Sequence, residues 1–273
     1  MNRLTEQDRA GIAWQRGIWD RYPDLYQREV DQRFAPVVEQ VLQRAVLVPG
    51  QHVLDLGTGT GAVALRAAPL VAPSGAVVAV DLSPAMLRVA QHRAEALGVR
   101  NLHCREGRAE AIPVDDGTCD VVLASLSLMY ALDRGAAARE IARVLCPGGR
   151  LVAAMWAGPE QCDLVRFQQT AGRFAPTPPV PGVGPGALAD PSPFLSQLAE
   201  AGIAASVETE TLGFDFASFA QAWEVMAHVT TSQLAPAQQQ EAQAAVLAAM
   251  WPHGDGPRHF RNVTQFILGQ RQR

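Results

Sequence analysis

The sequence predicts an α/β fold, a doubly wound and mostly parallel sheet of seven strands in which the last strand is antiparallel. Between residues 50 and 156, short apolar runs alternate with helical segments, which is typical of a parallel sheet with helices on both faces. The runs at 77–80 and 121–124 are continuously apolar, as expected of strands covered on both sides. The strand at 52–56 leads into a glycine-rich turn, which indicates a ligand site at the carboxyl edge of the sheet.

The N-terminal forty-odd residues are predicted to be helical. Trp14, Ile18, Trp19 and Tyr22 recur mainly at intervals of three to four residues, and Pro23 suits the first turn of a second helix. Aromatic side chains on one helix face usually pack against a core. The same segment could instead fold over a ligand as a lid, and both interpretations stay open.

The turn after the strand at 52–56 reads Gly57-Thr58-Gly59-Thr60-Gly61. Glycine lacks a Cβ, so the chain can turn sharply there and approach a ligand closely. A helix over 61–70 would place the free N–H groups of its first turn beside that ligand. The spacing also fits the G-x-G-x-x-G/A pattern of a dinucleotide site. Asp55 favours a cationic ligand, because a carboxylate at this edge would repel a pyrophosphate.

A second acid, Asp81, closes the apolar run at 76–80. It lies where a carboxylate that binds ribose hydroxyls is expected, roughly 20 residues beyond the glycines. Ser83 is a suitable N-cap and Pro84 a suitable first residue for a helix over 84–97.

The remaining elements complete the predicted sheet and its cover. Strands are expected near 101–105, 119–124, 150–156, 205–212 and 263–268, and helices near 134–145, 190–200, 216–229 and 236–250. The Pro- and Gly-rich stretch at 175–186 is expected to be a loop, since proline removes backbone donors. The last strand is expected to pair antiparallel with the strand at 205–212 at the sheet edge. We therefore divide the chain into an N-terminal helical lid (1–45), a cofactor-binding core (46–156) and an acceptor-covering insertion that completes the sheet (157–273).

Five blocks of the core resemble the motifs of class I S-adenosylmethionine-dependent methyltransferases of the small-molecule type. The blocks are 53–61, 81–87, Gly107-Arg108-Ala109-Glu110-Ala111-Ile112-Pro113, Asp120-Val121-Val122-Leu123-Ala124 and Leu145-Cys146-Pro147-Gly148-Gly149-Arg150-Leu151. They occur in the family's order. The resemblance implies a Rossmann-like fold, S-adenosyl-L-methionine as cofactor and S-adenosyl-L-homocysteine as product.

The resemblance also assigns roles to the matching positions. Asp55 and the glycines would face the methionine part of the cofactor, Asp81 would hold the ribose, and Leu82 or Met86 would pack on the adenine. The predicted cofactor-binding residues are Asp55, Gly57, Thr58, Gly59, Gly61, Asp81, Leu82, Met86, Arg108, Ala109, Glu110 and Ser125.

Arg108 departs from the family pattern, which often has an acid there to accept a hydrogen bond from the adenine amino group. Arginine cannot accept a hydrogen bond. Three alternatives remain: the backbone alone contacts the adenine edge, Glu110 replaces the acid, or the Arg108 guanidinium stacks on the ring.

The acceptor side is less clearly marked. Apolar pockets draw on aromatic and methionine side chains, and the predicted substrate-binding residues are Trp14, Trp19, Tyr22, Tyr130, Trp156, Phe194, Trp223, Met226 and His228. The catalytic residue stays unassigned, with His228 as a weak candidate for a general base.

Composition narrows the partners. The net charge is −4, so no basic field favours nucleic acid. No apolar run approaches the roughly 20 residues that span a bilayer, and the N-terminus has no apolar signal-peptide core, so a cytoplasmic location is expected. The four cysteines form no C-x-x-C pair, and no metal is predicted. Thiols that bind a metalloid, as in arsenic methyltransferases, are an alternative role for them.

The sequence therefore predicts methyl transfer from S-adenosylmethionine to O, N or C of a small, partly apolar molecule. One alternative is non-methylating use of the scaffold, as a cyclase or an S-adenosylmethionine-binding protein. Another is an NAD(P)-dependent oxidoreductase, although the chain has no Tyr-x-x-x-Lys constellation. The acceptor and the oligomeric state stay open.

Overall fold

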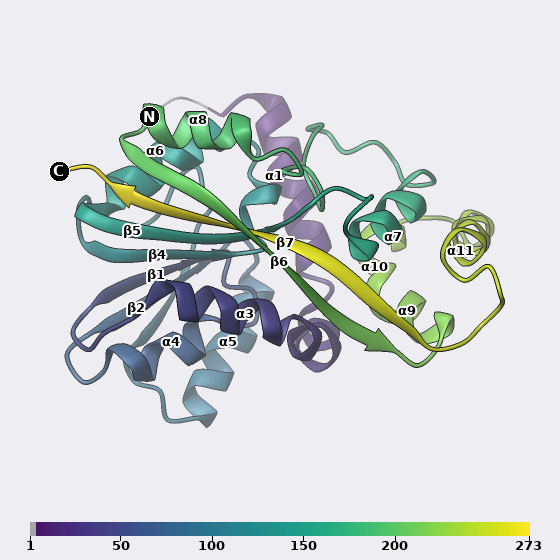
Figure 1. Cartoon of the computed structure of the whole chain (residues 1–273), viewed down its shortest axis with the longest axis horizontal. Helices are drawn as coiled ribbons and strands as arrows, with labels where there is room; N and C mark the ends of the chain where they lie inside the picture. The colour runs from purple at the N-terminus through teal and green to yellow at the C-terminus, as the bar shows by residue number, and fades with distance from the viewer. Residues whose placement is uncertain (1–3) are drawn as a thin grey trace.

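A computed structural model describes residues 4–273 and contains one seven-stranded sheet in the order β3-β2-β1-β4-β5-β7-β6. Helices cover both faces of the sheet (Figure 1). The predicted fold class and strand number are confirmed. Residues 1–3 of the N-terminal segment lie outside the described residues.

The first five strands are parallel to one another, whereas β7 is antiparallel to both β5 and β6. Their bounds are β1 (His52–Leu56), β2 (Ala76–Asp81), β3 (Leu102–Glu106), β4 (Cys119–Ser125), β5 (Leu145–Trp156), β6 (Ile203–Phe216) and β7 (Arg258–Arg271). The antiparallel pairing of β7 with β6 is present, with β6 at the sheet edge and β7 inside. Both strands are longer than predicted, because their polar and glycine-containing ends hide the alternation.

The N-terminal helices form an almost continuous run. They are α1 (Glu6–Trp19), α2 (Pro23–Leu25), the π-helix η1 (Tyr26–Val30) and α3 (Asp31–Ala45). Thr5 and Asp8 form a capping box that starts α1. As the sequence predicts, Pro23 opens the second helical segment.

Shorter helices connect the parallel strands. They are α4 (Ala64–Val71), α5 (Pro84–Ala96), the 3-10 helix η2 (Leu128–Tyr130) and α6 (Arg134–Val144). Ser83 caps α5 as predicted, since its Oγ accepts a hydrogen bond from the N–H of Met86 at 3.1 Å. The helix expected from residue 61 begins at Ala64, because Gly61 has a φ of +86° and belongs to the turn.

The C-terminal part adds α7 (Asp163–Gly172), α8 (Ser192–Glu200), α9 (Phe219–Met226), α10 (His228–Thr231) and α11 (Pro236–Met250). In Figure 1, α7, α9, α10 and α11 gather at the end of β6 and β7 that is remote from both chain termini. The helix predicted over 216–229 is wrong in its bounds, since Phe216 ends β6 and the helix breaks after Met226. Helix α7 was missed, although its buried residues Leu164, Phe167 and Ala171 follow helical spacing.

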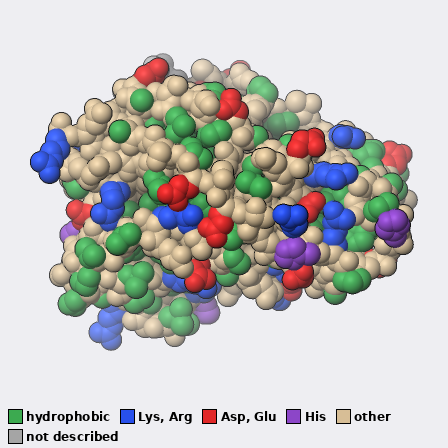
Figure 2. Space-filling view, viewed as in Figure 1, with side chains coloured by type: hydrophobic (Ala, Val, Ile, Leu, Met, Phe, Trp, Pro, Cys, Tyr) green, Lys and Arg blue, Asp and Glu red, His purple; other side chains and the backbone are tan. Residues whose placement is uncertain are grey.

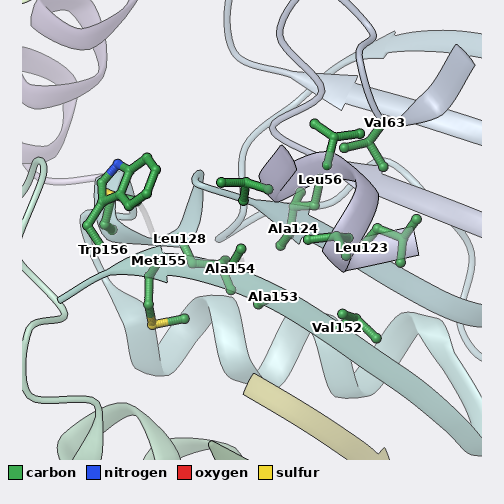
Figure 3. Close-up of a cluster of buried hydrophobic side chains, with 14 of the residues drawn as sticks. Leu56, Val63, Leu123, Ala124, Leu128, Val152, Ala153, Ala154, Met155 and Trp156 are labelled. Carbon is green, nitrogen blue, oxygen red and sulfur yellow. The ribbon is translucent and has the colours of Figure 1, made fainter. Parts of the chain in front are cut away.

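The core lies between the sheet and its helices. In Figure 3, side chains from the ends of β1, β4 and β5 converge on it, and Met155 and Trp156 point to opposite sides of β5. Within residues 4–273, no helix is long and apolar enough to cross a membrane. On the face shown in Figure 2, acidic and basic side chains are interspersed rather than gathered by sign.

Candidate functional site

A cavity of about 170 Å³ opens at the carboxyl ends of β1, β2 and β4, beneath the N-terminal helices. This is the edge at which the glycine turn predicts a ligand. Most of the predicted cofactor residues line it: Gly57, Gly59, Asp81, Leu82, Met86, Arg108, Ala109, Glu110 and Ser125. Asp55, Thr58 and Gly61 lie behind this wall.

The turn after β1 packs too tightly for any side chain at its first glycine. Gly57 has a φ of +75°, and a Cβ there would lie 2.3 Å from the Cβ of Ser127. Its N–H donates to the carbonyl of Val80 at 2.8 Å, which fastens the turn to the end of β2. Gly57 therefore sets how closely the backbone approaches the cavity.

Asp55 organises this turn from inside the protein. The residue is 1% exposed, and its carboxyl accepts hydrogen bonds from Thr58 Oγ1 at 2.6 Å and from the N–H of Ala64 at 3.0 Å. Helix α4 has no side-chain N-cap of its own, so Asp55 satisfies its first donor. The resemblance implies that Asp55 faces the methionine part of the cofactor. In the structure its carboxyl is instead turned toward α4.

The same arrangement bears on the choice of cofactor. In a dinucleotide site the pyrophosphate binds at the N-terminus of the helix that follows the glycine turn. Here the Asp55 carboxyl occupies that position. The Asp55 carboxyl therefore disfavours a pyrophosphate, as the sequence suggests. The reason is that it already occupies the position that the pyrophosphate would take.

Burial raises the pKa of Asp55 to about 7, from an ordinary value of 3.8. Between these values the folded protein holds a proton that the unfolded chain has released, so this group's contribution to stability falls as pH rises from about 4 to about 7. An asparagine side chain cannot ionise. We expect the free energy of unfolding of Asp55→Asn, taken relative to that of the wild type, to be higher at pH 8 than at pH 5. Urea unfolding at both pH values measures this change. A stability difference that is independent of pH would contradict this assignment.

Asp81 joins the ends of β1 and β2 and also reaches the cavity. Its Oδ2 accepts the N–H of Gly59 at 2.8 Å, and its Oδ1 accepts the N–H of Ser83 at 2.9 Å. Burial raises the pKa of this carboxyl above its usual value. A carboxylate offers about four lone-pair positions, so Asp81 can accept further hydrogen bonds from a pair of ligand hydroxyls.

The expected adenine end lies beside Met86 and Arg108. Glu110 is engaged within the protein, since its Oε1 accepts the N–H groups of Leu132 at 2.6 Å and Asp133 at 3.2 Å. Its Oε2 lies 3.5 Å from the Arg108 guanidinium. Among the three alternatives for the adenine edge, this geometry disfavours the one that depends on Glu110.

The chain is strained where β4 ends at the cavity. Leu126 has a φ of +56°, in the left-handed region that non-glycine residues rarely adopt. Its N–H donates to the carbonyl of Ala154 at 2.8 Å, which holds this conformation. Ser125 and Leu126 both line the cavity, and such strain often marks functional sites.

Polar contacts fasten the N-terminal helices to the site. Asp20 at the end of α1 accepts a hydrogen bond from Ser83 Oγ at 2.5 Å. Asp31 accepts hydrogen bonds from Thr60 Oγ1 at 2.8 Å and from Arg93 Nη1 at 2.6 Å. Arg93 also donates to the carbonyl of Thr60. Asp31 thus connects α3 to both the glycine turn and α5.

We expect Asp31→Ala to lower the free energy of unfolding by about 2 kcal/mol, because it leaves the partly buried Arg93 without its charged partner. The Asp31 side chain is 11% exposed and that of Arg93 26%, so the loss is smaller than for a fully buried pair. Thermal unfolding measures the effect, with Asp24→Ala as an exposed acidic control. Equal losses for the two variants would show that this contact does not anchor α3.

The opposite half of the cavity is aromatic. Six of the residues predicted to bind the substrate line it, namely Trp19, Tyr22, Tyr130, Trp156, Met226 and His228, together with Gln15, Tyr26, Phe34, Gln168 and Val225. Four rings form a row of contacts. The centroid distances are 6.2 Å between Trp19 and Tyr26, 6.4 Å between Tyr26 and Phe34, and 5.4 Å between Phe34 and Trp156. His228 is exposed at the rim, where its carbonyl accepts a hydrogen bond from the Tyr22 hydroxyl.

Three predicted acceptor residues lie elsewhere. Phe194 is 1% exposed in α8 and belongs to the core. Trp223 packs against Phe167 and Phe219. Trp14 lines a neighbouring cavity of about 220 Å³ instead. All three are aromatic side chains near the covering segments, and residue type alone does not separate a cavity wall from a helix interface.

Tyr26, Val30 and Phe34 line the cavity although they are not among the predicted site residues, and their spacing in the sequence indicates this position. Trp19, Tyr22, Tyr26, Val30 and Phe34 follow one another at intervals of three and four residues and all line the cavity. This spacing continues through the π-helix and marks one face of the N-terminal segment. The break expected at Pro23 concealed its continuity.

None of the four cysteines lines this cavity. Cys162 is buried, its Sγ lies 3.2 Å from Asn262 Oδ1, and burial raises the pKa of its thiol to about 12. Within residues 4–273 no group of three or more His, Cys, Asp or Glu side chains could hold a metal ion.

Comparison with known proteins gives matches to the core. A family model described as a methyltransferase domain matches residues 54–153. The chain is 42% identical over 104 residues to the ubiquinone/menaquinone biosynthesis C-methyltransferase UbiE of Pasteurella multocida, a match that covers 38% of this chain and 39% of that protein. The chain thus spans less than two thirds of the length of this curated relative.

Solved structures match over more of the chain. The YcgJ protein of Bacillus subtilis matches with a TM-score of 0.66 and 20% identity, over 88% of this chain and 99% of that one. The [4+2]-cyclase SpnF matches with a TM-score of 0.56 and 23% identity, over 87% and 80%. At such identities the likeness shows a shared fold.

The strand order, the glycine turn and the matched segment agree with one another. The resemblance predicted from the five blocks is confirmed, and with it the cofactor class that defines the family. The matched segment, residues 54–153, and the seven-stranded sheet around it therefore support a class I S-adenosylmethionine-dependent methyltransferase domain in this chain.

Proposed function

We propose that this protein transfers the methyl group of S-adenosylmethionine to a small, largely apolar acceptor. One observation carries the proposal: a single cavity has the glycine turn and Asp81 on one side and a wall of aromatic side chains on the other. A ligand on the first side and an apolar molecule on the second would lie next to each other.

The reaction requires mainly that the nucleophile is positioned correctly against the methyl group. The sulfonium cofactor supplies an activated methyl group, so the protein must hold the nucleophile in line at about 3–3.5 Å, an effect that can contribute roughly 7–11 kcal/mol. Trp19, Tyr130 and Trp156 would orient the acceptor and exclude water. His228 lies at the rim, where it could accept a proton from an acceptor that needs a base.

The cavity also supports the proposed division of the chain. The N-terminal helices of segment 1–45 supply Trp19, Tyr26 and Phe34, and segment 157–273 supplies Gln168, Val225 and Met226. We propose that the first segment acts as a lid and the second as the acceptor cover.

The test uses tritiated methyl donor and an apolar extract of small molecules. We expect label to move into the organic phase with the protein present, and no transfer with Asp81→Ala at low donor concentration. Binding of S-adenosylhomocysteine without any labelled product would favour the cyclase or binding-protein alternative. Calorimetry in which NADH binds and S-adenosylhomocysteine does not would favour the oxidoreductase.

A further inference from the structure

The chain contains three tyrosines, and all three line the cavity: Tyr22, Tyr26 and Tyr130. The hydroxyl of Tyr22 donates a hydrogen bond to the carbonyl of His228. Within residues 4–273, the hydroxyls of Tyr26 and Tyr130 have no hydrogen-bond partner. The main effect on the pKa of both phenols is burial, which raises it. Two phenol donors thus remain unused by the fold.

The rings of these two tyrosines both contact Trp19. The Trp19 and Tyr26 rings lie 6.2 Å apart at 81°, and the Trp19 and Tyr130 rings 5.1 Å apart at 87°. The three rings come from α1, η1 and η2, so segments far apart in sequence converge here. Because η2 follows β4 closely, Tyr130 lies near Ser125 in the chain, and both residues line the same cavity.

The hydroxyls of this pair act as donors. Burial raises the pKa of both phenols above their ordinary value of 10.0, so each keeps its proton at neutral pH. Both tyrosines are partly exposed and line the cavity, so their hydroxyls are open to a ligand. A ligand oxygen that accepts both hydrogen bonds would satisfy these two donors.

Several other polar groups of the aromatic half are already engaged within the fold. Gln15 Nε2 donates to the carbonyl of Tyr130 at 2.7 Å, and Gln168 bonds Met226 and Thr230 through both ends of its amide. Ser127 Oγ donates to the carbonyl of Leu56 at 2.6 Å. The Ser125 hydroxyl lies at the expected cofactor edge, and the His228 ring is exposed at the rim.

We propose that Tyr26 and Tyr130, which both contact Trp19 and line the same cavity, bind one uncharged oxygen of the acceptor, such as a carbonyl oxygen, by each donating a hydrogen bond to it. This inference rests on the proposed function and narrows its substrate class to apolar molecules that carry such an oxygen. A pure hydrocarbon would leave both donors unpaired. A phosphate would require cations, and Arg108, the arginine in the described wall, lies on the cofactor side.

The experiment compares acetophenone with α-methylstyrene, which have the same shape but differ in a C=O and a C=CH₂ group. The protein carries ¹³C at tyrosine Cζ and is saturated with S-adenosylhomocysteine. Its three tyrosine resonances are assigned with the variants Tyr22→Phe, Tyr26→Phe and Tyr130→Phe. We expect acetophenone to shift the resonances of Tyr26 and Tyr130 and to bind about tenfold more tightly than α-methylstyrene.

The variants separate the roles. Tyr26→Phe and Tyr130→Phe should each reduce the preference for acetophenone by about threefold and together abolish it, while the control Tyr22→Phe should keep it. The proposal is overturned if the preference survives in the double variant, or if millimolar probes shift neither resonance. It is also overturned if Tyr26→Phe weakens S-adenosylhomocysteine binding and leaves the preference intact. Failure of the wild type to bind S-adenosylhomocysteine would count against the proposed function itself.

Discussion

Replacing Asp81 with alanine is expected to weaken the binding of S-adenosylhomocysteine by roughly 10- to 150-fold, or about 1.5–3 kcal/mol. The carboxylate accepts the N–H groups of Gly59 and Ser83 and lines the cavity. Its loss removes the proposed acceptor for the ribose hydroxyls and also leaves two turn donors unpaired. Isothermal titration calorimetry measures the change.

Two further variants make this experiment specific. Asp115 is exposed in a loop, so Asp115→Ala removes an equal charge outside the cavity and should leave affinity unchanged. Asp81→Asn keeps one acceptor oxygen and should fall between the wild type and the alanine variant. Wild-type affinity in Asp81→Ala would remove the ribose assignment.

The second large effect is expected at Gly57. A non-glycine residue at its φ of +75° costs about 1–2 kcal/mol, and the added Cβ would lie 2.3 Å from Ser127 Cβ, which requires a backbone shift that typically costs about another 1–3 kcal/mol. Gly57→Ala should therefore lose about 2–5 kcal/mol of unfolding free energy. It should also lose affinity for S-adenosylhomocysteine, because the shift moves the cavity wall.

Gly117 provides the matched control. Its φ is +64°, and a Cβ there would meet no atom within 4 Å. Gly117→Ala should show only the cost of the left-handed backbone, about 1–2 kcal/mol, with unchanged affinity. Chemical denaturation of both variants checks the difference, and equal losses would mean that the contact between Gly57 and Ser127 carries no cost.

The cofactor half of the site could be predicted because its signals are local. Gly57 follows the end of β1, Asp81 is the last residue of β2 and Ser83 is the N-cap of α5, and at such positions a few consecutive residues determine the backbone. Even there the sequence did not reveal the orientation of Asp55. Its carboxyl turns toward Ala64 because α4 lacks its own cap, and this depends on the helix beginning at residue 64.

The acceptor half was harder to predict because it depends on tertiary packing. Phe194 and Tyr130 are both aromatic, and no spacing pattern in the sequence distinguishes them. Phe194 is nevertheless buried in α8, whereas Tyr130 lines the cavity. Tyr26 and Phe34 could have been found from their spacing with Trp19. Gln168 could not, since it reaches the cavity from α7, a helix that is absent from the predicted elements.

A crystal structure with S-adenosylhomocysteine tests the central claim most directly. We expect the ribose hydroxyls on the Asp81 carboxylate, the adenine beside Met86, and the sulfur facing the space between Ser125 and Tyr130. S-adenosylhomocysteine bound outside this cavity, or lying with its sulfur turned away from the aromatic wall, would contradict the account.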